Sequence, residues 1–308
     1  MFKIGIVENF HKDGIKLLED HPNFEYEIID DVSKENLIKE LPKFDGLTLR
    51  VAKLGSDVLS KCKKLKVISR HGVGYDNVDI NHLKKNNITL LITATGNALA
   101  VAEHVMYMML SLSKGVTLYD SEVRSGNFKK NANKIETYEL YKKEILIAGF
   151  GRIGKNLIKR CLGFDMKVNV FDPFIDESTI KSYGGNKVDN LQTAIKTSDF
   201  VSIHMPLNEK TRYLIDAKIL KTMKSNAVII NTARGGIVNE VDLDNALKSK
   251  IIYAAGLDVF EKEPPDTNNP LLKKLFIILL SYMVLFCFQK NQLYFELFQH
   301  SFLIYTRL

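Results

Sequence analysis

The stretch EILIAGFGRIG at residues 144–154 decides the fold. Its apolar, β-prone beginning, Ile145–Ala148, is typical of a buried parallel strand. Gly149, Gly151 and Gly154 follow as G-x-G-x-x-G. In this motif the first glycine permits a tight turn, the second lets the backbone approach a pyrophosphate, and the third allows close helix–strand packing. An ordinary glycine-rich turn can have the same spacing of glycines. The surrounding sequence therefore has to distinguish such a turn from a dinucleotide-binding motif.

A second predicted strand, Lys167–Phe171, ends at Asp172, about 20 residues after the glycines. A carboxylate at this place accepts hydrogen bonds from the ribose 2′-hydroxyl of a dinucleotide and repels a 2′-phosphate. No arginine follows Asp172 closely. The sequence therefore predicts a dinucleotide site that prefers NAD to NADP.

Further strand–helix units continue on both sides of this region. Three more apolar runs each end in a polar cluster, at Phe200–His204, Ala227–Asn231 and Ala254–Val259. The N-terminal residues 1–95 repeat the pattern, with strands expected at Lys3–Val7, Phe24–Ile29, Gly46–Arg50 and Leu65–Ser69. Alternating strands and helices indicate parallel sheets. The fold class is therefore α/β, with two Rossmann-like doubly wound parallel-sheet domains, and ligands are expected at the carboxyl ends of the strands.

The composition is that of an ordinary globular protein, with 308 residues, 45% hydrophobic and 26% charged. The net charge of +7 comes from scattered lysines, which argues against a nucleic-acid-binding face. Cys62, Cys161 and Cys287 show no C-x-x-C spacing, so we expect neither a disulfide framework nor a metal site. We expect a cytoplasmic protein that begins with a strand instead of a signal peptide.

Six ordered stretches carry a family resemblance. The chain resembles the D-2-hydroxyacid dehydrogenases, and within them the phosphoglycerate dehydrogenase branch, over roughly residues 1–272. The stretches are RHGVGYDNVD (70–79), GNALAVAEH (96–104), GFGRIG (149–154), VSIHMPLNEKTRYLI (201–215), INTARGGIVNE (230–240) and GLDVFEKEPP (256–265). The resemblance implies a flavodoxin-like substrate domain over residues 1–97 and an NAD-binding domain over residues 98–274.

The resemblance also implies which residues bind NAD. They lie in the glycine turn and in the polar clusters that follow the later strands: Gly149, Gly151, Arg152, Ile153, Gly154, Asp172, His204, Pro206, Thr211, Thr232, Ala233, Arg234 and Asp258. For the substrate, a small 2-hydroxy or 2-keto acid, the resemblance implies Arg50, Val73, Gly74 and Arg234. The Arg50 side chain can equally be a solvated loop charge.

The family uses an arginine, a glutamate and a histidine for catalysis. The resemblance places the arginine at Arg234, where a planar guanidinium suits the substrate carboxylate, and the glutamate at Glu263. The acid–base histidine should follow Pro270-Leu271-Leu272, but in family register Tyr282 stands in its place. We therefore expect the activity of this chain to be impaired. The alternative is a catalytically inactive NAD-binding regulatory protein on the same scaffold.

The family pattern stops at an apolar tail, residues 275–308, which stands where the family's returning substrate-domain segment is expected. Leu275–Phe288 is apolar except for Ser281, and fourteen residues are short for a membrane-spanning helix. Three hypotheses stay open: a divergent folded segment, a short membrane anchor, and a changed reading frame or retained non-coding sequence. The abrupt change favours the third, and a membrane partner is not expected. The apolar helix expected at Glu103–Ser113 suggests a homodimer, by resemblance.

Overall fold

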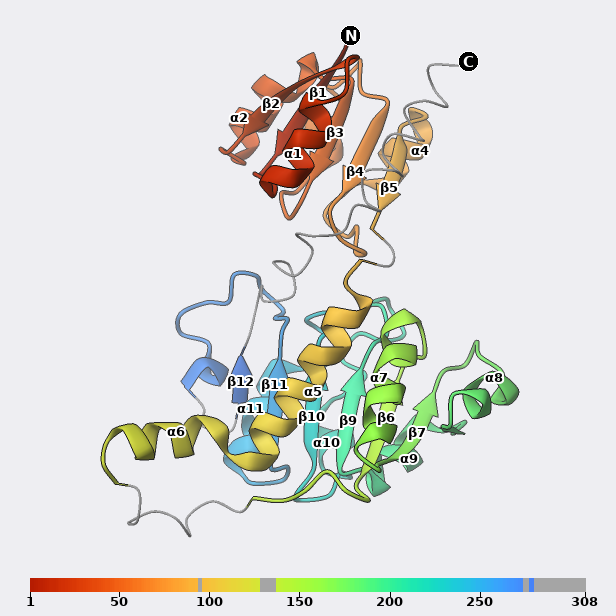
Figure 1. Cartoon of the computed structure of the whole chain (residues 1–308), viewed down its shortest axis with the longest axis vertical. Coiled ribbons are helices and arrows are strands. Elements are labelled where there is room, and N and C mark those ends of the chain that lie inside the picture. The colour runs from red at the N-terminus through yellow and green to blue at the C-terminus, as the bar shows by residue number, and fades with distance from the viewer. Residues whose placement is uncertain (94–95, 128–136, 274–276, 280–308) are drawn as a thin grey trace. The chain divides into compact units, whose positions relative to one another are not determined.

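The computed structural model describes residues 1–93, 96–127, 137–273 and 277–279. The chain forms two compact units, one of Met1–Asn97 and one that starts at Ala98. Each unit contains one parallel sheet with helices on its faces (Figure 1). Within the described ranges, none of the helices has the length and apolar character needed to cross a membrane.

The N-terminal unit is built on five parallel strands. They are β1 (Phe2–Val7), β2 (Phe24–Ile29), β3 (Gly46–Leu49), β4 (Val67–Arg70) and β5 (Thr89–Ile92), in the order β2-β1-β3-β4-β5. The connections contain α1 (Lys12–Glu19), α2 (Lys34–Glu40), the 3₁₀ turn η1 (Leu41–Lys43), α3 (Ser56–Leu59) and α4 (Ile80–Lys85). This is the flavodoxin-like strand order, in which the direction of winding reverses between β1 and β3.

Helices cover both faces of this sheet because successive strand side chains point to opposite faces. Ile4 and Ile6 of β1 pack with Leu18 of α1 on one face, whereas Val7 belongs to the core on the other face. That second core also contains Leu47 and Leu49 of β3, with Leu37, Val58, Leu59 and Leu83 from helices α2, α3 and α4.

The C-terminal unit is built on seven parallel strands. They are β6 (Glu144–Ala148), β7 (Lys167–Phe171), β8 (Asn186–Lys187), β9 (Phe200–Ile203), β10 (Val228–Asn231), β11 (Ala254–Leu257) and β12 (Ile277–Leu279), in the order β12-β11-β10-β9-β6-β7-β8. The helices are α5 (Ala98–Lys114), α6 (Val116–Arg124), α7 (Arg152–Gly163), α8 (Glu177–Ser182), α9 (Leu191–Thr197), α10 (Ala217–Leu220), α11 (Glu240–Lys248) and the 3₁₀ turn η2 (Pro270–Lys273). The winding reverses between β6 and β9, and this switch point is where doubly wound sheets usually bind their ligands.

Two hydrophobic cores fill the two faces of the C-terminal sheet. Ile145 and Ile147 of β6 pack with helices α5 and α7, which cross in front of the strands in Figure 1. Leu146 and Ala148 pack in the other core, with residues of α9, α10 and α11. The doubly wound arrangement expected from the sequence is therefore confirmed in both units.

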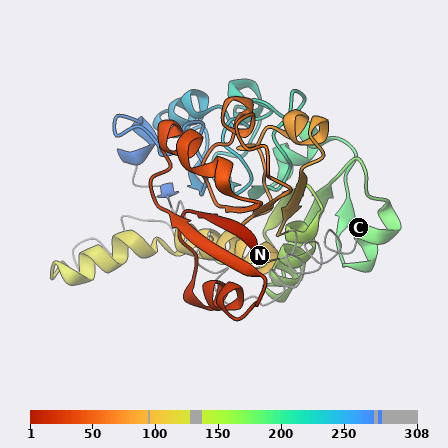
Figure 2. The ribbon, with the colours of Figure 1, turned by 90° about the horizontal axis from the view of Figure 1, so that it is seen from above.

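Helix α6 is the exception to this packing. It contains no buried residue, and it projects from the C-terminal unit in both views (Figures 1 and 2). Its side chains Val116 and Val123 are 46% and 53% exposed. These valines lie outside the hydrophobic cores of the unit.

The C-terminal region differs from the expectation in one respect. The predicted boundary at residue 274 precedes strand β12, which pairs in parallel with β11 and extends the sheet. The apolar run from Leu275 thus supplies a strand of the C-terminal unit. Tyr282 and residues 280–308 lie outside the described residues, so the three hypotheses for the tail stay predictions.

Gly5 provides a test of the N-terminal core. A Cβ atom at this position would lie 2.8 Å from both Leu47 Cδ2 and Phe44 Cδ2, two buried side chains. We expect Gly5→Ala to lower the free energy of unfolding by about 1–3 kcal/mol, because overfilling a packed core forces its neighbours to move. The measurement is urea denaturation followed by circular dichroism.

Gly14→Ala is the matched control, since a Cβ atom there meets nothing within 4 Å and the residue lies inside helix α1. It should raise the stability by roughly 0.5–1 kcal/mol. Equal effects of the two substitutions would contradict the packing described for Gly5.

Candidate functional site

The glycine turn between β6 and α7 has the geometry that dinucleotide binding requires. Gly149 has φ +104°, and a Cβ atom there would lie 2.7 Å from the His204 carbonyl oxygen. A Cβ atom at Gly154 would lie 2.5 Å from the Gly149 carbonyl oxygen, whereas one at Gly151 meets nothing within 4 Å. Gly151 therefore faces open space, and helix α7 begins at Arg152 with no side-chain cap. These uncapped amides fit a phosphate group.

Asp172, at the end of β7, is held beside this turn by two backbone amides. Its Oδ2 accepts a hydrogen bond from Phe150 N at 2.8 Å, and its Oδ1 accepts one from Phe174 N at 2.9 Å. The carboxylate is thus fixed beside the glycine turn, and its contact with the ribose of a dinucleotide stays a prediction.

His204 closes the other side of the turn. Its backbone N–H donates to the Ala148 carbonyl at 2.7 Å, and its Nε2 lies 2.9 Å from Ser202 Oγ. Burial lowers the pKa of its imidazole to about 3, so the ring is neutral at physiological pH. His204 can therefore serve as a neutral wall of the crevice, and it is a poor proton carrier near neutrality.

Pro206 and Thr211 belong to the loop that follows. Thr211 Oγ1 donates to the Pro206 carbonyl oxygen at 2.7 Å and accepts from Asn208 N at 2.8 Å. The Thr211 hydroxyl thus stabilises the loop of residues 206–211, to which it belongs. Contact of Pro206 and Thr211 with a cofactor stays a prediction.

The loop after β10 positions Arg234. Asn231 fixes this loop, because its Nδ2 donates to the Arg234 carbonyl at 2.8 Å and its Oδ1 accepts from Ala233 N at 3.1 Å. Arg234 Nη1 donates to the Ala233 carbonyl at 2.7 Å. Thr232 Oγ1 is buried and has no hydrogen-bond partner among the described residues. A buried hydroxyl of this kind is suited to a ligand atom.

The Arg234 loop touches the Glu263 loop through the backbone. A Cβ atom at Gly235 would lie 1.8 Å from the Phe260 carbonyl oxygen, so only glycine fits there. Glu263 Oε1 in turn accepts from Phe260 N at 3.0 Å. The structure therefore brings together the two loops that carry the predicted catalytic arginine and glutamate.

Two further glutamates fasten the Glu263 loop, and the sequence reasoning missed them. Glu240 N donates to Glu261 Oε1 at 3.0 Å, and Glu261 N donates to Glu240 Oε1 at 2.5 Å. The Tyr213 hydroxyl also donates to Glu261 Oε2 at 2.9 Å. Residue 240 is the last residue of one quoted stretch and Glu261 belongs to another, but only the fold makes them neighbours.

Asp258 is the most perturbed carboxyl group of this edge. Burial first, and then the charge of Glu263, raise its pKa to about 7. His104 Nε2 of helix α5 lies 3.7 Å from Asp258 Oδ1. Strongly shifted carboxyl groups in a ligand-binding crevice are typical of functional sites.

The N-terminal unit contains the predicted substrate residue Arg50. Two residues that the sequence reasoning did not assign to the site, Arg70 and His71, lie near it. Arg50 Nη1 donates to the Asn9 carbonyl at 3.3 Å, and Asn77 links Arg50 to Arg70 through hydrogen bonds of 3.3 and 3.4 Å. Burial, followed by the charges of Arg50 and Arg70, lowers the pKa of His71 to about 4. This positive cluster fits an anionic ligand.

Val73 and Gly74 follow β4 in the same unit. The preceding Gly72 has φ +147°, and a Cβ atom there would lie 2.0 Å from Arg70 Nη1. Arg70 also donates to the His71 carbonyl. The position of Arg70 at the carboxyl end of β4 was the signal that could have identified it as a candidate site residue.

The raised pKa of Asp258 predicts a pH-dependent stability. In the unfolded chain the carboxyl ionises near its ordinary value of 3.8, but in the folded chain it ionises only near 7. Its contribution to stability is therefore fully present below pH 3.8 and is lost as the pH rises through 7.

Asp258→Asn should consequently raise the free energy of unfolding at pH 8, on the order of 3 kcal/mol, and this gain should shrink toward pH 4. Urea denaturation at pH 4, 6 and 8 measures it. Asp165→Asn, which replaces an exposed carboxyl group, serves as a control. An equal gain in the free energy of unfolding at all three pH values would show that burial of the Asp258 charge is not the cause.

Comparison with known proteins agrees with this geometry. A family model described as "D-isomer specific 2-hydroxyacid dehydrogenase, NAD binding domain" matches residues 106–283. The chain is 37% identical over 273 residues to the D-3-phosphoglycerate dehydrogenase of Methanocaldococcus jannaschii, and the match covers 88% of this chain and 51% of that protein. It thus spans about half the length of this relative.

Two other proteins match over most of their lengths. The hydroxypyruvate reductase of Thermotoga maritima is 36% identical over 265 residues, covering 86% of this chain and 84% of that protein. The crystal structure of the TT0316 protein from Thermus thermophilus superposes with a TM-score of 0.84 at 25% identity, covering 92% of this chain and 89% of that one. The cofactor of the matched domain is NAD, as the glycine turn and Asp172 indicate. The chain therefore belongs to the D-isomer specific 2-hydroxyacid dehydrogenase family, whose members are NAD-dependent oxidoreductases.

Proposed function

We propose that this chain is built to transfer hydride between NAD and the CH–OH carbon of a small D-2-hydroxy acid, 3-phosphoglycerate or a related acid. The observation that carries the proposal is the backbone contact between Gly235 and Phe260, which brings the Arg234 loop to the Glu263 loop. Asp258 lies beside Glu263 at the same edge. An arginine and two acids at the carboxyl edge of an NAD-binding sheet suit oxidation of a carboxylate-bearing alcohol.

The residues of the chain have distinct roles in this proposal. NAD, when bound, supplies the hydride acceptor. The Arg234 guanidinium binds the substrate carboxylate through two parallel hydrogen bonds and polarises the adjacent C–O bond. Glu263, whose carboxylate is aligned by Phe260 N, is placed to stabilise a cationic proton carrier.

The anionic character of the substrate has a second support in the N-terminal unit. Arg50 and Arg70 both depress the pKa of His71, which shows that their charges act on the same small region. Relatives of this chain are named D-3-phosphoglycerate dehydrogenase, hydroxypyruvate reductase and glyoxylate reductase. These names share a small carboxylic acid. We propose that Arg50, Val73 and Gly74 bind an anionic group of such an acid.

We further propose that catalysis by this chain is impaired. Tyr282 stands in sequence register where the family's histidine is expected, and an ordinary tyrosine has a pKa of about 10. General acid–base catalysis typically contributes about 10²–10⁴-fold to the rate. The alternative function is an NAD-binding regulatory protein without turnover. The lack of a histidine in register at Tyr282 favours this alternative as well.

A cytoplasmic location fits the cysteines that the structure describes. Cys62 and Cys161 are free and buried, and burial raises their pKa values to about 11 and about 12. Burial makes these thiols unreactive at neutral pH, and it is their being free that is typical of a reducing compartment.

The deciding experiment measures binding and turnover separately on the full chain. We expect calorimetry to detect NAD⁺ binding. NADH formation with 3-phosphoglycerate, D-glycerate or D-lactate should be at least about 100-fold slower than the typical enzyme rate of about 10 s⁻¹. Oxidation of one of these acids at ordinary rates would refute the impairment, and failure to bind NAD⁺ would refute the proposed function itself.

Substrate binding by Arg234 can be tested without turnover. With NADH present, Arg234→Lys should weaken the binding of hydroxypyruvate at least about tenfold, because lysine cannot form the bidentate contact. Arg212→Lys is the matched control, since Arg212 lies over the exposed Tyr213 ring, 5.6 Å from its centre. Similar affinities for both variants would remove Arg234 from the proposed site.

We also propose that the chain forms a homodimer through α5 and α6, whose Tyr107 and Val123 are 49% and 53% exposed. Val123→Glu should shift the mass measured by size exclusion with light scattering from dimer to monomer, since a charge would be buried in an apolar interface. Phe174→Glu, at a side chain that is 92% exposed elsewhere on the unit, should leave the mass unchanged. A monomeric unaltered protein would refute the dimer.

A further inference from the structure

Helix α5 brings a histidine against the acid of the cofactor site. The His104 and Asp258 side chains are only 6% and 11% exposed, and His104 Nε2 lies 3.7 Å from Asp258 Oδ1. Neither atom has a hydrogen-bond partner among the residues that the structure describes. Two buried polar atoms that face each other without other partners are costly unless they serve each other or a ligand.

The packing of α5 on strand β11 explains this proximity. A Cβ atom at Gly256 would lie 2.8 Å from Met108 Sδ, so the missing side chain lets the helix approach the strand. Met108 and His104 are four residues apart and share one face of the helix. Asp258 follows Gly256 two residues later, where β11 has just ended. His104 is therefore fixed to the cofactor site from a different element.

We propose that His104 is a positioning residue for the nicotinamide end of the cofactor site: its Nε2–H donates to Asp258 Oδ1 and holds that carboxylate as a hydrogen-bond acceptor for the amide group of the nicotinamide. This inference rests on the role of Asp258 in NAD binding within the proposed function. The atoms need to approach by less than about 1 Å for a hydrogen bond of ordinary length.

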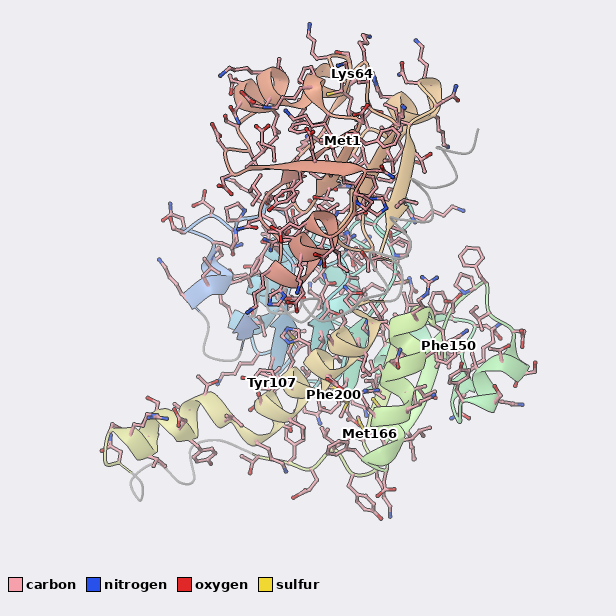
Figure 3. The ribbon with its side chains drawn as sticks, turned by 45° about the horizontal axis from the view of Figure 1, so that its top comes forward. Met1, Lys64, Tyr107, Phe150, Met166 and Phe200 are labelled. Carbon is pink, nitrogen blue, oxygen red and sulfur yellow. The ribbon has the colours of Figure 1, made fainter. Side chains whose placement is uncertain are left out.

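The groups around the pair favour a neutral donor. Burial lowers the pKa of His104, so the ring is uncharged at neutral pH but still carries one N–H. The charge of Glu263 opposes the ionisation of Asp258, so a donor is needed to keep that carboxylate an acceptor. The Tyr107 ring, labelled in Figure 3, lies nearly parallel to the His104 ring, with centroids 6.4 Å apart and planes inclined by 12°.

The test compares two ligands on the full chain by calorimetry at pH 7.5. ADP-ribose fills the same glycine turn as NAD⁺ but lacks the nicotinamide. His104→Leu should weaken NAD⁺ about tenfold, the loss expected for one hydrogen bond to a charged group, and change the affinity for ADP-ribose by less than about twofold. His104→Gln, whose amide can donate, should stay within about threefold of the unaltered protein for NAD⁺.

Two further variants complete the design. His82→Leu, in helix α4 of the N-terminal unit, controls for the loss of a histidine and should change neither affinity. In the Asp258→Asn background, His104→Leu should weaken NAD⁺ by less than about twofold, because its partner is already altered.

Three results would overturn the inference: equal losses for NAD⁺ and ADP-ribose, no loss for either, or a glutamine variant as weak as the leucine variant. If the leucine variant does not fold, His104→Phe, which keeps a planar ring but has no N–H, takes its place and should show the same selective loss of NAD⁺ affinity. No turnover is measured, so a chain that binds NAD⁺ without oxidising any hydroxy acid leaves this test intact.

Discussion

The site of the C-terminal unit depends on backbone contacts that only glycine permits. Gly149 meets the backbone of His204, and Gly235 meets the backbone of Phe260. Each contact joins loops that follow different strands at the carboxyl edge of the sheet. A side chain at either glycine would separate the loops, and the phosphate turn and the Arg234–Glu263 pair of loops would lose their alignment. The hydrogen bonds made by Asn231, Glu240 and Glu261 then fix the loops in place.

Buried polar atoms at this carboxyl edge of the sheet lower the stability of the fold. Asp258, His104 and Thr232 bury polar atoms that have no hydrogen-bond partner within the described ranges. Burying such groups costs free energy in the unliganded protein, and a ligand that satisfies them recovers it. An enzyme or a regulatory NAD-binding protein would both benefit from this arrangement. The distinction between them depends on the proton carrier, because Tyr282 stands in sequence register where a histidine is expected by resemblance.

Much of this could be predicted from the sequence. Residues 144–154 with Asp172 identified an NAD-binding α/β unit, because strand, glycine spacing and terminal carboxylate are local features fixed by backbone geometry. The family resemblance is confirmed by the matched model and the relatives. The alternation of Ile145 to Ala148 between two cores likewise follows from the two-residue period of a strand. Strand β12 was not expected in the apolar run after Leu275, since its sequence offered no polar strand end to mark it.

Tertiary structure alone decided which distant residues act on each other. The resemblance had grouped Arg50 with Val73 and Gly74, but only the fold shows that the charges of Arg50 and Arg70 both act on His71. His104 belongs to a helix that reads as ordinary core, and it reaches Asp258 only because Gly256 lets α5 approach β11. Local sequence determines the turns, strands and caps, because these depend on neighbouring dihedral angles. Burial, and the pKa shifts and pairings that it causes, depend on contacts between residues of different elements, such as His104 and Asp258, and these contacts exist only after packing.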